Sequence, residues 1–167
     1  MLSERGYARM TVAAVAARAA VSEPTVYLRY PTKRDLALAA VVHLPVLADP
    51  PDTGDAFDDL AALLARLVAA TEAAGGMPLA SAVLAEQNRH PELVEQWRAT
   101  VGTALRSVVE RIVDRGQRRE QLKPGLSADL VADLVLGAHL ARYTYRGRPA
   151  RGWPRQVINV LRPALEP

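Results

Sequence analysis

Apolar residues recur every three or four positions over most of the 167-residue chain, the spacing that places them on one face of an α-helix. Strict alternation of apolar and polar residues, the pattern of a half-buried strand, is absent from the sequence. The pattern therefore predicts an all-α fold. Its clearest stripe lies between Glu92 and Gly116, where we expect one long amphipathic helix at the centre of a helical body, with apolar positions Leu93, Trp97, Val101, Leu105, Val108, Val109, Ile112 and Val113.

Two further helices are expected near the carboxyl end. Residues 127–145 are apolar on more than one face, so we expect this helix to bury one surface in its own core and one against a partner chain. The last helix should begin near Pro154, because proline suits the first helical turn. Gly137 either permits close approach of a second copy or is merely tolerated. The candidate residues for an interface in a homodimer are Leu130, Leu134, Gly137, Ala141, Val157, Ile158, Leu161 and Leu165.

A polar, proline-rich segment over residues 48–55 divides the chain, since the consecutive prolines Pro50 and Pro51 cannot continue a helix. We place a domain boundary there, with residues 1–45 as a small head and residues 46–167 as a helical body. The head holds six Lys and Arg against three Asp and Glu, whereas the body holds fifteen of each. The net charge of +3 therefore lies in the head, as expected of a module that binds an anionic partner.

Composition excludes several classes of site. The chain has no cysteine, which rules out disulfides, thiolate metal ligands and a cysteine nucleophile. Its three histidines, His43, His90 and His139, are too scattered to predict a metal site, and we expect neither metal nor cofactor. No apolar run approaches the roughly 18 residues that span a membrane, and Met1–Arg9 carries no secretory signal. We expect a cytoplasmic protein without membrane contact.

Two charged clusters in the body have ordinary structural interpretations. The first is expected to be a solvated, helix-capping group of carboxylates, and it comprises Asp49, Asp52, Asp55, Asp58 and Asp59. The second should stabilise a helix carboxyl end, where cations are favourable, and it comprises Arg115, Arg118, Arg119 and Lys123. Neither cluster is assigned to a ligand.

Residues 11–30 predict two short helices joined by a tight turn, which is a helix-turn-helix. Thr11 is a plausible N-cap of the first helix, which we expect to run to Ala20. Ser22 is the N-cap candidate of the second helix. Pro31 should end that helix, and Thr32-Lys33-Arg34-Asp35 has the form of a capping box that opens another helix through about His43.

A gap-free run of residues in this region has the order and spacing found in one known family: Glu4-Arg5-Gly6-Tyr7, Thr11-Val12, Val15-Ala16, Ala19, Val21-Ser22, Pro24-Thr25-Val26-Tyr27 and Tyr30-Pro31-Thr32-Lys33, with Leu36 and Val41 following. The first 45 residues thus closely resemble the DNA-binding domain of TetR-family (tetracycline-repressor-like) transcriptional regulators. The resemblance implies a helix-turn-helix head on a ligand-binding, dimerising body. It also implies a repressor that a small apolar or amphipathic ligand releases from a palindromic operator.

The sequence departs from the family pattern at two places. Ala20 stands where the family usually has glycine in the turn, and alanine costs about 1 kcal/mol more than glycine if the backbone φ is positive there. Only Met1–Arg5 precede Gly6-Tyr7, whereas the family's first helix begins a dozen or so residues earlier. We therefore expect a truncated first helix, either because its start is missing from this chain or because the head is incomplete.

The helix over residues 23–30 is the candidate reader of DNA, because an α-helix fits the major groove, about 12 Å wide, where base edges are distinguishable. Val26 should face the core. The expected base contacts are Glu23, Pro24, Thr25, Leu28 and Arg29. The expected phosphate contacts, similar to those of the family, are Thr11, Ser22, Thr25, Tyr27, Tyr30 and Lys33. Tyr27 and Tyr30 could alternatively be core aromatics with solvated hydroxyls. One short helix reads too few base pairs, so two copies on a palindrome are expected.

A small-molecule site in the body is supported only by residue types, since ligand pockets are mostly apolar with a few polar anchors. Packing is the alternative for each candidate, and Gln87, His139 and Tyr143 are the stronger ones because polar groups on apolar faces need partners. The candidates are Met77, Leu84, Gln87, Trp97, Leu105, His139, Leu140 and Tyr143.

Two other classes of function compete with a regulator. The first is a helical interaction protein with a TetR-like fold that has lost DNA binding. The second is an enzyme, which the sequence disfavours because it contains no phosphate-cradling glycine-rich loop and no Ser/His/Asp arrangement. We therefore expect a protein that is not an enzyme.

Overall fold

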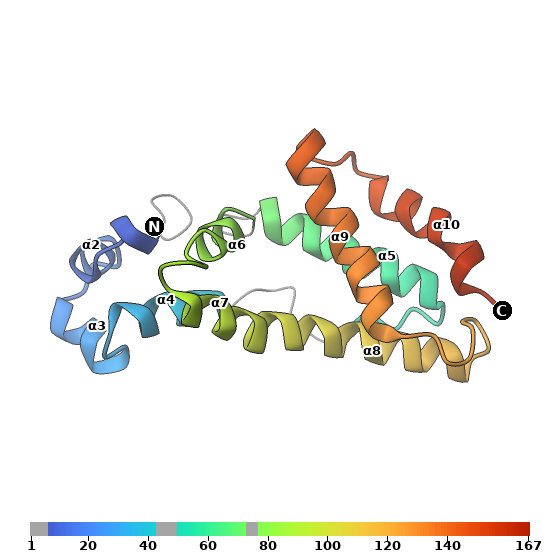
Figure 1. Cartoon of the computed structure of the whole chain (residues 1–167), viewed down its shortest axis with the longest axis horizontal. Helices are drawn as coiled ribbons and strands as arrows, with labels where there is room; N and C mark the ends of the chain where they lie inside the picture. The colour runs from blue at the N-terminus through green and yellow to red at the C-terminus, as the bar shows by residue number, and fades with distance from the viewer. Residues whose placement is uncertain (1–6, 43–49, 73–76) are drawn as a thin grey trace. The chain divides into compact units, whose positions relative to one another are not determined.

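The computed structural model describes residues 7–42, 50–72 and 77–167, and every regular element in these ranges is helical (Figure 1). The all-α prediction is confirmed. The elements are α2 (Val12–Arg18), α3 (Glu23–Arg29), α4 (Lys33–Val42), α5 (Ala56–Glu72), α6 (Met77–Leu84), α7 (Pro91–Trp97), η2 (Arg98–Gly102), α8 (Thr103–Arg118), α9 (Ala128–Arg146) and α10 (Trp153–Leu165). The predicted truncation of the first helix falls on residues 1–6, outside the described residues.

Residue contacts divide the chain into two compact units. The first unit comprises Met1–Leu44 with Ala70–Gly102, and the second comprises Pro45–Ala69 with Thr103–Pro167. Within the first unit α4 contacts both α7 and η2. Residues 70–102, which the sequence analysis counted with the body, thus share contacts with the head. The division into head and body near residue 45 stays a prediction.

Local hydrogen bonds form the helix-turn-helix as predicted. The Thr11 hydroxyl accepts a hydrogen bond from Ala14 N at 3.2 Å, and the Ser22 hydroxyl accepts one from Thr25 N at 3.3 Å. Each serves as the N-cap of its helix. The first helix ends at Arg18, two residues earlier than expected.

The turn between α2 and α3 has the positive φ that the sequence analysis considered for Ala20, which stands where the family usually has glycine. Ala20 has φ +55°, in the left-handed region that glycine adopts more easily than alanine. Val21 N donates to the Ala16 carbonyl at 3.0 Å, which closes the turn over the end of α2. The strain at Ala20, about 1 kcal/mol relative to glycine, is therefore held by the surrounding backbone.

The capping box at residues 32–35 is confirmed in both directions. Thr32 N donates to Asp35 Oδ2 at 3.0 Å, and Asp35 N donates to the Thr32 hydroxyl oxygen at 3.1 Å. These bonds satisfy amides that the first turn of α4 leaves without helical partners. The described part of this helix ends at Val42, and His43 lies outside the described residues.

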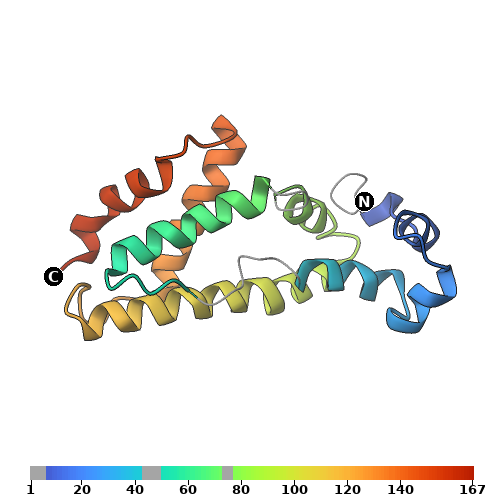
Figure 2. The same ribbon diagram turned by 180° about the vertical axis from the view of Figure 1, so that it is seen from behind.

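The prediction of one regular helix from Glu92 to Gly116 is wrong in its middle. Helical structure runs from Pro91 to Arg118, as the green-to-yellow ribbon of Figure 2 shows. Within this run Arg98–Gly102 form a π segment between α7 and α8. Thr100, Val101 and Gly102 all have lower helix propensity than alanine or leucine, so this segment is the weak point of the run. The predicted apolar stripe is buried except for Trp97, which is half-buried.

The core of the second unit is formed by α5, α8, α9 and α10. Fully buried side chains include Leu60 and Leu64 of α5, Ile112 of α8, Val135 of α9 and Ile158 of α10. Helices α8 and α9 contact each other along their buried faces. This packing positions the outer faces of α9 and α10 toward solvent.

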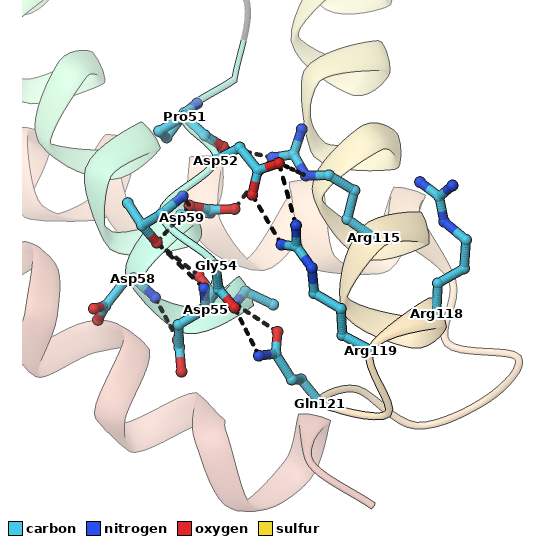
Figure 3. A network of polar contacts seen from close by, with 12 residues as sticks. Pro51, Asp52, Gly54, Asp55, Asp58, Asp59, Arg115, Arg118, Arg119 and Gln121 are labelled. Atoms are coloured by element: carbon cyan, nitrogen blue, oxygen red, sulfur yellow. Dashed lines mark hydrogen bonds and ion pairs between the residues drawn. The ribbon is translucent and has the colours of Figure 1, made fainter.

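Ion pairs and hydrogen bonds between aspartates and arginines link α8 to the start of α5 and to the segment that precedes α5 (Figure 3). The Asp59 carboxylate is only 1% exposed, accepts hydrogen bonds from Thr53 N and Oγ1, both at 2.8 Å, and pairs with Arg115 Nη2 at 3.1 Å. Asp52 pairs with Arg119 at 2.8 Å, and this hydrogen bond lowers the pKa of Asp52.

The two charged clusters are thus partly as expected. Asp55 caps α5, since its carboxylate accepts from Phe57 N at 2.8 Å and Asp58 N at 2.9 Å. The prediction of a fully solvated acidic stretch is wrong, however, because Asp59 is buried and pairs with Arg115. Arg115 and Arg119 bind carboxylates as well as lying at a helix end, whereas Arg118 Nε donates to the Asp114 carbonyl at 3.3 Å. Asp49 lies outside the described residues.

Candidate nucleic-acid interface

Helix α3 packs on the head through one buried side chain, Val26, and its other side chains are exposed to solvent. Val26 is buried with Val12 and Ala16 of α2, and Tyr30 and Leu36 pack against this small core. The five predicted base contacts are all exposed, namely Glu23, Pro24, Thr25, Leu28 and Arg29. Leu28 is 90% exposed. The helix therefore presents charged, hydroxyl and apolar groups on one accessible surface.

Hydroxyl groups gather at the amino-terminal ends of α2 and α3. The Ser22 and Thr25 hydroxyl oxygens are 2.8 Å apart, and both residues are exposed. Thr11 is also exposed, and among the described residues its oxygen accepts only from Ala14 N, so its proton can be donated outward. Amides at a helix amino terminus and nearby hydroxyls favour anions.

The two tyrosines differ in their surroundings. Tyr27 is exposed, whereas Tyr30 is half-buried and its ring packs against the Val12/Ala16/Val26 core. The guanidinium of Arg29 lies 6.0 Å from the centre of the Tyr30 ring. Tyr30 therefore combines the core packing of the alternative interpretation with a position beside a cation.

Lys33 is held by contacts that the sequence analysis missed. Its Nζ donates to the Ala8 carbonyl at 3.2 Å and lies 4.5 Å from the centre of the Tyr7 ring. Burial raises the pKa of Tyr7, as does the negative charge of Glu92, so this ring stays neutral. An ammonium has three donor hydrogens, so Lys33 keeps donors for a further anion.

The Tyr7 ring also contacts His90, edge to face, with centroids 5.2 Å apart. His90 in turn lies 3.4 Å from the Glu92 carboxylate. Helical periodicity has no means of predicting a contact between residues so far apart in the sequence. The available signal was the Gly6-Tyr7 motif, which marks Tyr7 as part of the head.

The predicted ligand contacts fall in both compact units. In the first, Leu84 and Gln87 are exposed, Trp97 is half-buried, and Gln87 Oε1 accepts from Arg98 Nη2 at 3.2 Å. Met77 is the first residue of α6, and its side chain lies outside the described residues.

In the second unit, Leu105 and His139 are buried, Tyr143 is half-buried and Leu140 is exposed. The rings of His139 and Tyr143 meet edge to face with centroids 5.1 Å apart. Burial lowers the pKa of His139. The ligand site as a whole stays a prediction.

The outer faces of α9 and α10 carry most of the predicted interface residues. Leu130, Leu134, Gly137 and Ala141 are exposed on α9, while Val157 and Leu161 are half-buried on α10. A shallow groove of about 390 Å³ between the helices is lined largely by apolar residues, among them Leu134, Val157, Val160 and Leu161.

Two predicted interface residues need correction. Ile158 and Leu165 are buried within the protomer, because they lie on the side of α10 that packs into the core. The sequence analysis missed Val160, which is 80% exposed on the opposite side of α10. An apolar residue at the same helical spacing as the stripe can thus belong to either face.

Neither a metal site nor a membrane-spanning helix is found in the described part of the chain. Among the residues of ranges 7–42, 50–72 and 77–167, no three His, Asp or Glu side chains gather as metal ligands would. In the same ranges no helix combines the length and apolar character needed to cross a bilayer.

Comparisons with known proteins agree with this architecture. Residues 1–40 match the family model described as "Bacterial regulatory proteins, tetR family", and residues 50–160 match the model described as "Tetracyclin repressor-like, C-terminal domain". HTH-type transcriptional regulators of Mycobacterium bovis and of Mycobacterium tuberculosis strain H37Rv are 38% identical over 122 residues, which is 70% of this chain. The chain spans 59% of the length of these relatives.

Solved structures are similar over nearly the whole chain. The TetR-family transcription regulator SCO0332 has a TM-score of 0.76 at 23% identity, with 99% of this chain and 92% of that chain covered. The reduced form of E. coli NemR has a TM-score of 0.71 at 16% identity, with 98% and 91% covered. At this identity the likeness shows a shared fold.

Proposed function

Since the chain belongs to the tetR family of bacterial regulatory proteins, we propose that it is a transcriptional regulator that binds double-stranded DNA through α3. The observation that carries the proposal is the open surface of α3, which Val26 attaches to the core from the other side. A family of regulatory proteins favours a regulator over an enzyme. We infer that it acts in the cytoplasm, where chromosomal DNA is accessible.

Base reading is assigned to the exposed side chains of α3. The Glu23 carboxylate would accept from a cytosine amine, and Leu28 would contact a thymine methyl group, as would Pro24. Thr25 offers a hydroxyl to either kind of base edge. Arg29 would donate to guanine or to a neighbouring phosphate.

Phosphate binding is assigned to the hydroxyls at the helix ends and to Lys33. Thr11, Ser22 and Thr25 lie where free amides and the helix dipole already favour an anion. The Tyr27 and Tyr30 hydroxyls would add contacts along the same strand. These groups fix the register of α3 in the groove without distinguishing bases.

A homodimer is expected because one copy of α3 is too short to contact enough base pairs for regulation. Two copies of α3 on a palindrome, about 34–36 Å apart, read enough base pairs for regulation. The exposed apolar residues of α9 and α10, with Val160 in place of the buried Ile158 and Leu165, are the surface we assign to the second copy.

We further propose that a small apolar or amphipathic ligand bound in the helical body releases the protein from a palindromic operator. Within the second unit, the polar candidates His139 and Tyr143 would anchor it, and the apolar candidates Leu105 and Leu140 would contact it. Repression follows if the operator overlaps a promoter.

Selection of bound sequences from random duplex DNA tests the proposal with the full chain. We expect enrichment of a palindrome whose half-sites are one helical turn apart. A variant with Thr25→Ala, Leu28→Ala and Arg29→Ala should lose the enrichment, because it removes three of the side chains assigned to base reading. The variant should still fold, since all three side chains are exposed and their removal leaves the core intact.

The matched control carries Arg111→Ala and Glu110→Ala on the exposed surface of α8 and should select the same palindrome. Enrichment that survives the α3 variant would refute the assignment of α3. Enrichment of no sequence at all would instead favour a helical interaction protein that has lost DNA binding.

A further inference from the structure

Four side chains of the first compact unit connect the start of α7 with the start of α4. His90 and Glu92 lie at the start of α7, Lys33 is the first residue of α4, and Tyr7 contacts both His90 and Lys33. The centre of the Tyr7 ring lies 4.5 Å from Lys33 Nζ and 5.2 Å from the centre of the His90 ring. The lysine assigned to DNA phosphate is thus linked to a segment far away in the sequence.

Neutral groups hold the Lys33 ammonium. Its Nζ donates to the Ala8 carbonyl at 3.2 Å and lies over the face of the Tyr7 ring. In the part of the chain that the structure describes, Lys33 forms no ion pair with a carboxylate. A carboxylate would neutralise the ammonium, whereas a carbonyl and an aromatic face fix its position and leave its charge for a phosphate.

The Tyr7 ring is itself fixed and uncharged. The residue is 9% exposed, and burial raises the pKa of its phenol. Carboxylates from three elements raise this pKa further, namely Glu92 of α7, Glu86 of the turn after α6 and Asp35 of α4, while Arg34 opposes them. A neutral aromatic ring presents a negative face to a cation. Because a buried ring moves little, its face determines where the Lys33 ammonium lies.

The His90 side chain supports this ring and has no part in capping α7. His90 occupies the N-cap position, but its side chain makes no capping hydrogen bond, and its backbone N donates to the Glu86 carbonyl at 2.7 Å. The His90 ring meets Tyr7 edge to face, and its Nδ1 lies 3.4 Å from the Glu92 carboxylate. The ring is therefore oriented by Glu92 on one side and packs on Tyr7 on the other.

We propose that Tyr7 and His90 are positioning residues that hold the Lys33 ammonium where it meets a DNA phosphate. The inference rests on the proposed function, in which Lys33 contacts phosphate. A flexible lysine side chain loses rotamer freedom on binding, and one that is already held loses less, so the contact is stronger. A movement of the start of α7 would displace the His90 ring and weaken this contact with the DNA backbone.

The first measurement needs no DNA. Lys33 and Lys123 are the two lysines of the chain, so selective isotope labelling of lysine gives one set of side-chain NMR signals for each. The ring current of Tyr7 should shift the ε-protons of Lys33 upfield, since they lie over its face. Lys123, whose Nζ donates to the Ala164 carbonyl, provides the reference signal.

Variants of His90 test whether its ring holds Tyr7 in place. His90→Ala should move the Lys33 signals toward those of Lys123, and His90→Phe should return them upfield because it restores a ring. The fold should tolerate both changes, since the His90 side chain is 43% exposed and caps no helix. The matched control is Asn88→Ala, at an exposed position of the same turn, which should leave the signals unchanged.

The second measurement is a double-mutant cycle on DNA. Fluorescence anisotropy follows binding of the full chain to a labelled duplex of mixed sequence at several salt concentrations. Lys33→Ala should weaken binding and reduce the salt slope by about one phosphate contact. Tyr7→Leu should weaken binding about threefold or more because it removes the cation–π contact, while Tyr7→Phe keeps the ring and should bind as the wild type does. Added to Lys33→Ala, Tyr7→Leu should cause no further loss.

Two results would overturn the inference alone. Lys33 signals that His90→Ala leaves unchanged would mean that His90 does not position the ring. A loss of affinity in Tyr7→Leu that is equally large with and without the Lys33 side chain would mean that Tyr7 serves only the fold. An unchanged affinity and salt slope in Lys33→Ala would refute the phosphate contact and this inference with it, and a wild-type chain that binds no duplex would refute the proposed function as a whole.

Discussion

Replacing Asp59 with alanine should destabilise the fold strongly, because the carboxylate is buried in a network that spans the segment before α5 and helix α8. Asp59 is 1% exposed, and Arg115, its partner at 3.1 Å, is 18% exposed. Breaking a buried ion pair by removing one partner typically costs about 3–5 kcal/mol, since the remaining charge is left uncompensated.

The structure places the expected cost of Asp59→Ala at the lower end of that range. Arg115 would keep a hydrogen bond to the Pro51 carbonyl and a long contact with Asp52, whose carboxylate lies 3.9 Å from Arg115 Nε. Thr53 would lose the acceptor of both its amide and its hydroxyl. We expect a loss of about 3 kcal/mol, which lowers Tm by about 6–12 °C in a chain of this length.

Thermal unfolding followed by far-ultraviolet circular dichroism measures the effect. The control is Arg106→Ala, which removes an ion pair to Asp129 of 2.7 Å whose side chains are 61% and 63% exposed. That exposed pair should contribute about 1 kcal/mol or less. If Asp59→Ala lowers Tm by no more than Arg106→Ala, the argument from burial is wrong.

A double variant separates the effect of leaving the Arg115 charge without its partner from the effect of lost packing. Asp59→Leu with Arg115→Met replaces the pair by apolar side chains, a change that is often neutral for buried pairs. It should unfold at a higher temperature than Asp59→Ala. A double variant as unstable as Asp59→Ala would refute the stranded charge as the cause.

Five further variants test other parts of the molecule. Lys33→Ala should weaken binding to all duplexes and reduce the slope of log affinity against log salt by about one phosphate contact, whereas Arg29→Ala should change the preferred base at one position, both measured by fluorescence anisotropy. Val160→Asp should give monomers in sedimentation velocity, since it places a charge on the exposed apolar face of α10. Gly116→Ala should destabilise the second unit by about 1–3 kcal/mol in urea unfolding, because a Cβ there would lie 2.6 Å from Leu122 Cδ1 and 2.8 Å from Ala56 Cβ. Burial lowers the pKa of His139 from 6.5, so as pH falls the unfolded chain binds the proton before the folded chain does. Stability should therefore be full above pH 6.5 and decrease as pH falls from 6.5 toward the folded-state pKa. His139→Gln should remove that part of the pH dependence.

Each of these has a result that contradicts it. An unchanged salt slope in Lys33→Ala would remove Lys33 from phosphate binding. A uniform loss of affinity in Arg29→Ala, with base preference unchanged, would remove Arg29 from base reading. A dimeric mass for Val160→Asp would mean that the interface lies elsewhere. Wild-type stability of Gly116→Ala would mean that Leu122 moves without cost. An unchanged stability profile below pH 6.5 in His139→Gln would assign the slope to other groups.

Interactions between residues three or four apart explain why the head could be predicted from the sequence. The N-caps at Thr11 and Ser22 and the reciprocal bonds of Thr32 and Asp35 each close within one helical turn. Even the positive φ of Ala20 followed from its position in the turn. Such contacts depend on local sequence alone, so residue type and spacing sufficed to predict them.

Contacts between distant segments were decided only by the tertiary structure. Asp59 and Arg115 come from different helices, and neither spacing nor propensity predicts that they meet. The same holds for Tyr7 and His90.

The faces of α10 show the same limit in a single helix. Ile158 and Val160 are both apolar, yet one is buried and the other 80% exposed. Periodicity places residues on faces of a helix, and when both faces are apolar only packing against neighbouring helices decides which face becomes core and which stays open to a partner.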